Sequence, residues 1–217
     1  MTSEIRQKPM WRRLAVPLLV GALTGGLASF TFLQLIEFDG REGLGTSREI
    51  AGLVGVLYVL SGLAVLVGAL SPRVGSKFLN VEDADELREM RSGLQSSGSA
   101  MILLGGTLVL LAIAGDGAFV PAGVAAILAV AMIVLASVLS IRSKRYSDEM
   151  QRALSADATA TAFYLLFFFG GGWALFAHFG LLAAAAPLDW LTMVAVALLV
   201  AAFWQTARRG LLNRGPN

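Results

Sequence analysis

The chain has 217 residues, of which 56% are hydrophobic and 15% are charged, and its net charge is +2. Soluble domains average about 25% charged residues, so this composition indicates an integral membrane protein. The absence of cysteine excludes disulfides, a thiol nucleophile and cysteine-based metal or haem attachment.

Six apolar stretches are long enough to cross a membrane. A helix rises about 1.5 Å per residue and therefore needs roughly 20 apolar residues to cross a hydrocarbon core of about 30 Å. None of the stretches shows the period-two alternation of a barrel strand. We predict an all-α, polytopic membrane protein with a single domain, 1–217. The predicted spans are residues 14–36, 50–70, 96–115, 118–141, 158–180 and 187–207.

The basic residues gather on one side of this topology. Fifteen of the seventeen lysines and arginines fall in four segments, 1–13, 71–95, 142–157 and 208–217, and only Arg41 and Arg48 fall on the other side. By the positive-inside rule, both termini are expected in the cytoplasm, with the protein in a bacterial inner membrane. Because topology explains the basic excess, no nucleic-acid partner is expected.

The only dense charge run lies at residues 80–94. Asn80 is a candidate N-cap, and Leu87 and Met90 recur at helical spacing on one narrow apolar stripe. The pattern predicts a short amphipathic helix that lies along the membrane surface or runs straight into the next span. We expect this helix to bind a partner protein; the alternative is a solvated helix at headgroup level. The acidic candidates are Glu82, Asp85, Glu86 and Glu89.

A weaker copy of this pattern, Asp148-Glu149, precedes the predicted span 158–180. Polar residues also open the spans that begin near residues 96 and 158. These similarities suggest a parallel internal repeat that covers residues 50–115 and 118–180. The alternative is that the two segments are similar because both start a helix in the inner leaflet, where the same residue types are favoured.

A second function hypothesis rests on the polar starts of the same two spans. The central zones of all the spans lack Asp, Glu, Lys and Arg, which argues against a proton relay. Asp157 lies at an inner helix end, where it could line a cytosol-facing vestibule of a small-solute permease or channel. The alternative is a seam of small residues between the two spans, with the Asp157 carboxylate in the first turn, where it interacts favourably with the helix dipole. The other vestibule candidates are Ser96, Ser97, Thr159 and Thr161.

Signals for catalysis or for a cofactor are weak. His178 is the only histidine, so a haem or quinone site would need a second copy or a partner subunit. No nucleophile motif or phosphate-binding loop is present. The carboxylates in 37–49 match no calcium loop, which favours a solvated acidic turn. We therefore expect neither an enzyme nor a bound cofactor or metal.

The segment Asp83-Ala84-Asp85-Glu86-Leu87-Arg88, which leads into a span, carries a loose family resemblance. The layout resembles small multi-pass bacterial inner-membrane proteins of uncharacterised families, some of them encoded beside helix-turn-helix regulators. That resemblance implies such regulators as candidate partners. The leading hypothesis is a non-enzymatic protein that binds a cytosolic or membrane partner in a regulatory, sequestering or assembly role, with a homo-oligomer as a further option.

Overall fold

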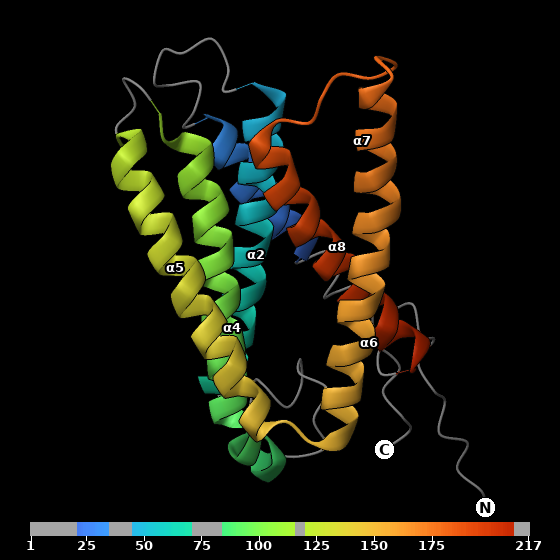
Figure 1. Ribbon diagram of the computed structural model, residues 1–217. Helices are drawn as coiled ribbons and strands as arrows, with labels where there is room; N and C mark the ends of the chain where they lie inside the picture. Colours follow the sequence, from blue (N-terminus) through green and yellow to red (C-terminus); the bar gives the residue numbers. More distant parts are fainter. Residues whose placement is uncertain (1–20, 35–44, 71–83, 116–119, 211–217) are drawn as a thin grey trace, which may run out of the picture.

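The computed structural model describes residues 21–34, 45–70, 84–115 and 120–210, with residues 84–90 described by their backbone alone. Every regular element in these ranges is helical, which confirms the all-α prediction (Figure 1). Residues 21–34 form one helix. The other elements are α2 (Thr46–Leu70), α4 (Ala84–Ile113), α5 (Ala122–Ser143), a 3-10 turn (Lys144–Tyr146), α6 (Glu149–Leu165), a π turn (Leu166–Gly170), α7 (Gly171–His178) and α8 (Pro187–Arg208).

Five helices in the described ranges are long and apolar enough to cross a membrane. They cover Thr46–Leu70, Arg91–Ile113, Ala122–Tyr146, Glu149–His178 and Pro187–Arg208, in agreement with five of the predicted spans. The predicted span 14–36 lies partly outside the described residues. The Glu149–His178 helix begins well before the predicted residue 158, because polar residues continue a helix that Asp148 caps.

Helix α4 decides between the two arrangements proposed for the charged segment. The helix begins at Ala84 and continues without a break to Ile113, so the segment runs straight into the span. No proline interrupts this stretch. Glu82 lies outside the described residues.

Four glycines bring α2 and α4 into close contact, and we call them the glycine seam: Gly55 and Gly62 on α2, Gly98 and Gly105 on α4. A Cβ built on Gly55 would lie 2.6 Å from the Gly105 carbonyl oxygen, and one on Gly105 would lie 2.5 Å from the Gly55 oxygen. A Cβ on Gly62 would lie 2.6 Å from the Gly98 oxygen. At these points the two helices have room for hydrogen atoms only.

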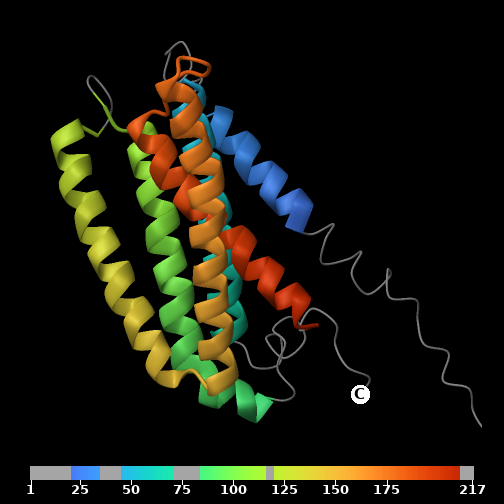
Figure 2. The same cartoon turned by 45° about the vertical axis from the view of Figure 1, so that its right-hand side comes forward.

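The seam repeats every seven residues along both helices. One repeat beyond Gly62 and Gly105 lie Ala69 and Ala112, and both are fully buried. A seven-residue repeat of contact positions is typical of helices that cross at a shallow angle of about 20°. The helix at residues 21–34 packs against both α2 and α4, because the Phe32 ring contacts Gly52 on α2 and Ala112 on α4. Figure 2 shows this helix beside α2, away from α5.

The helices α6, α7 and α8 form the other half of the molecule. α8 crosses behind the gap between α4 and α6 and packs mainly on α6 (Figure 1). The Tyr58 hydroxyl on α2 donates to the Ala195 carbonyl oxygen on α8 at 2.7 Å and joins the two halves. α2 and α4 pack side by side, whereas α5 and α6 diverge from the turn that connects them. The internal repeat is therefore not confirmed.

Replacing Gly55 with alanine tests the glycine seam. We expect Gly55→Ala to lower the free energy of unfolding by about 1–3 kcal/mol, because the new methyl group meets a carbonyl oxygen that cannot move independently of its helix. Thermal unfolding of the detergent-solubilised protein measures this loss. Gly172→Ala is the matched control, since its Cβ has no neighbour within 4 Å and a helical alanine gains up to about 1 kcal/mol. Equal melting temperatures for both variants would contradict the close packing.

Candidate functional site

A cavity of about 1060 Å³ lies between α4, α5 and α6, and we call it the groove. Its lining reaches the end of the helices where most described cations gather, and we call this end the basic end. Helices α4 and α6 begin there, and α5 and α8 end there (Figure 1). The cations of the basic end are Arg91, Arg142, Lys144, Arg145, Arg152, Arg208 and Arg209.

The mouth of the groove is built from the turn between α5 and α6. Lys144, Tyr146, Ser147, Gln151 and Arg152 line it. No aspartate or glutamate is among the described residues that line the groove. The mouth therefore carries two cations among neutral polar groups.

Local contacts hold this turn against α4. The Ser143 hydroxyl donates to the Gly93 carbonyl oxygen at 3.1 Å, and the Ser147 hydroxyl donates to the Ser143 carbonyl oxygen at 3.2 Å. A Cβ on Gly93 would lie 3.2 Å from the Cβ of Tyr146, so a small residue at position 93 lets the turn approach. The Tyr146 hydroxyl interacts with the side chains of Ser92 and Arg142. The position of the mouth is thus fixed relative to α4.

The inner part of the groove is apolar. Met101 and Leu104 line it from α4, and Phe163 and Tyr164 line it from α6. Ser97 and Thr159 lie between the polar mouth and this apolar part, on opposite walls. The Thr159 hydroxyl donates to the Ser155 carbonyl oxygen of its own helix at 2.8 Å. The groove therefore changes from basic and polar to apolar along its length.

The structure divides the five predicted vestibule residues into three groups. Ser97 and Thr159 line the groove. Ser96 is buried, and its hydroxyl donates to the Ser92 carbonyl oxygen at 2.9 Å. Asp157 and Thr161 bond to α8 instead.

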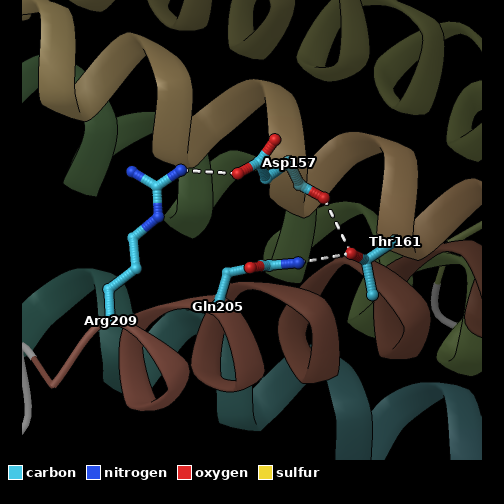
Figure 3. A network of polar contacts seen from close by, with 4 residues as sticks. All are labelled: Asp157, Thr161, Gln205 and Arg209. Atoms are coloured by element: carbon cyan, nitrogen blue, oxygen red, sulfur yellow. Dashed lines mark hydrogen bonds and ion pairs between the residues drawn. The ribbon is translucent and has the colours of Figure 1, made fainter.

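The contacts of Asp157 and Thr161 form one polar network between α6 and α8 (Figure 3). Arg209 Nη2 lies 2.5 Å from Asp157 Oδ2. The buried Gln205 donates through Nε2 to Thr161 Oγ1 at 2.7 Å, and the Thr161 hydroxyl donates to the Asp157 carbonyl oxygen at 2.7 Å. The network ties the end of α8 to the middle of α6.

Small residues continue this contact toward the centre of the helices. Ala162 on α6 packs with Ala197 and Ala201 on α8, and Leu165 packs against them. The seam that the sequence suggested between spans three and five is therefore found between α6 and α8. The prediction named the wrong neighbour, because α4 uses its small residues to pack on α2.

Gln205 and Arg209 are not among the residues predicted from the sequence to form a site. A usable signal was present, because Gln205 is a polar residue in an apolar span and Arg209 follows it at a spacing of one helical turn. Arg209 was interpreted only as one of the basic residues that set the membrane orientation. Lys144 and Arg152 at the mouth were overlooked for the same reason.

The residues predicted to bind a partner also lie at the basic end. Asp148 is the N-cap of α6, and its Oδ1 accepts a hydrogen bond from the Gln151 N–H at 2.6 Å. Glu149 follows in the first turn. The remaining candidates in the described part of the chain are Asp85, Glu86, Leu87, Glu89 and Met90, in the first turns of α4.

His178 and Glu49, the described residues considered for metal or haem, lie far from the groove. His178 is exposed at the opposite end, where its ring contacts Phe179. Within the described ranges, no group of three or more His, Cys, Asp or Glu side chains has the geometry to hold a metal ion. Glu49 lies in the first turn of α2, whereas Glu37, Asp39 and Glu42 lie outside the described residues.

Comparison with known proteins gives no relative from which a function could be carried over: no family model, curated protein or solved structure matches this chain.

Proposed function

We propose that the chain is a multi-pass inner-membrane protein with six spans, whose basic end faces the cytoplasm. Two observations support this proposal. The five apolar helices leave large hydrophobic side chains exposed, such as Ile127 at 73% and Phe169 at 73%, where lipid would cover them. All described cations except Arg48 belong to the basic end or to the start of α4 that adjoins it, as the positive-inside rule requires.

Cysteine labelling tests this orientation, because the chain has no cysteine of its own. We expect a membrane-impermeant maleimide to label Gly180→Cys from outside intact spheroplasts. Arg145→Cys should react only after the membrane is opened. Labelling of Arg145→Cys in intact spheroplasts would reverse the orientation.

The groove supports binding of a small ligand from the cytoplasmic side, as part of a permease. The single observation that carries this function is the cavity of about 1060 Å³ with Ser97 and Thr159 on opposite walls. Its volume lies just above the range of about 300–1000 Å³ that is typical of small-molecule sites. Polar groups at the mouth and apolar groups inside would orient a ligand with two chemically different ends.

Filling the groove tests its role. We expect Thr159→Trp to lower ligand uptake into liposomes at least about tenfold, because the indole occupies space between α4 and α6. Flux of a solute panel in reconstituted vesicles measures this effect. Thr206→Trp is the matched control, since both threonine hydroxyls donate to the carbonyl oxygen four residues earlier and Thr206 does not line the groove. Flux that survives Thr159→Trp, or that is absent for every solute, would count against a permease.

A second candidate function is partner binding through the start of α4. The specific observation is that α4 begins at Ala84, whereas the span within it begins only at Arg91. Two helical turns therefore extend beyond the span and carry Asp85, Glu86 and Glu89. A charged helix held at the membrane surface can select a partner by electrostatic complementarity.

Charge reversal tests the partner hypothesis. We expect the lysine variant of Glu82, Asp85, Glu86 and Glu89 to insert normally and to lose a stoichiometric partner in affinity purification, because repulsion replaces attraction. Mass spectrometry of the purified complexes measures the loss. Glu49→Lys, at the opposite end, is a control that should keep the partner. A partner retained by the reversed variant would rule out this surface.

A further inference from the structure

We infer that the groove binds an anionic phospholipid, with its phosphate at Lys144 and Arg152 and an acyl chain along Met101, Leu104 and Phe163. The inference rests on the proposed function, because it names the ligand class of the same cavity. Three features of the groove support it: the charge of the mouth, the chemistry of the inner walls and the exposure of its apolar wall.

The mouth favours an anion. Lys144 and Arg152 line it, and no carboxylate lines the described part of the groove. Asp148 and Glu149 are the nearest carboxylates along the chain, and neither lines the groove. Asp148 already accepts the hydrogen bond that caps α6. Charge-assisted hydrogen bonds from arginine and lysine are the strong contacts of phosphate groups, and basic pockets between spans are typical sites for anionic headgroups.

The inner walls suit an alkyl chain. Beyond Ser97 and Thr159 the lining consists mainly of aliphatic and aromatic side chains. A free phosphate or a small hydrophilic anion would gain nothing from Met101, Leu104 or Phe163. An acyl chain gains dispersion contacts along the same surface. The change from basic to apolar along the groove thus matches an amphiphile with its charge at one end.

The apolar wall of the groove is partly exposed at the surface of the helices. Helices α5 and α6 diverge from their connecting turn, and α8 contributes no residue to the lining (Figure 1). Phe163, which lines the groove from α6, is 61% exposed. A lipid can therefore enter laterally, with its headgroup at the level of the mouth and its chain between the helices.

Native mass spectrometry of the full chain in mild detergent tests the proposal. The probes are phosphatidylglycerol and phosphatidylcholine with identical dioleoyl chains, and inorganic phosphate. We expect phosphatidylglycerol to bind about tenfold more tightly than phosphatidylcholine. This preference should disappear in Lys144→Gln/Arg152→Gln. The matched control Arg145→Gln/Arg208→Gln removes the same charge from the same end without touching the groove lining, and it should keep the preference.

Each other outcome overturns a defined part of the proposal. If the control variant loses the preference for phosphatidylglycerol to the same extent, the preference comes from diffuse surface charge and not from the groove. Inorganic phosphate that displaces the lipid at equal concentration would assign the site to a free anion. If both lipids bind alike and Thr159→Trp removes both, the groove still binds a ligand and only the anionic selectivity fails. If Thr159→Trp leaves phosphatidylglycerol bound, the lipid lies elsewhere and the ligand function of the groove fails with it.

Discussion

The contact between α2 and α4 is the constraint on which the rest of the molecule depends. Lipid tails are as apolar as leucine, so helices in a bilayer associate through dispersion and polar contacts that require close approach. The glycine seam provides that approach, with helix backbones meeting at Gly55 and Gly105 and again at Gly62 and Gly98. These two helices also make the contacts that hold the other elements. Ala112 packs with Phe32, Gly93 accepts the hydrogen bond that positions the mouth of the groove, and Tyr58 bonds to α8.

The two walls of the groove are held by interactions of different strength. The α4 wall belongs to the seam, whereas the α6 wall is held by α8 through the polar network and three alanines. Hydrogen bonds between membrane helices contribute about 0.6 kcal/mol on average, and exposed ion pairs about 0–1 kcal/mol. The Asp157 side chain is 53% exposed, so its pair with Arg209 belongs to the weak class. Changes in groove width are therefore expected to come from movement of α6, the less firmly held wall.

Local sequence determines the helices, and tertiary pairing determines the groove. The length of the apolar stretches identified five spans that the structure contains. This works because a helix in lipid must form all its backbone hydrogen bonds within itself and cannot depend on its neighbours. Ser97 and Thr159, which line the groove, are among the predicted vestibule residues, since a polar start on each of two spans is visible in one sequence. The neighbour of α6 was not predictable in this way. Alanines and glycines lie on several helices, and nothing local shows that Asp157 meets Arg209 while Gly98 meets Gly62.

The π turn at Leu166–Gly170 decides which side of its helix meets α8. Before the turn, Asp157, Thr161 and Leu165 contact α8 at intervals of four residues. The next contact comes five residues later, at Gly170, which packs on Trp190. In a regular helix Phe169 would take that place, and its ring would separate the two helices. The wide turn acts as a single-residue insertion that carries all three phenylalanines to the lipid side, where they are 62–73% exposed.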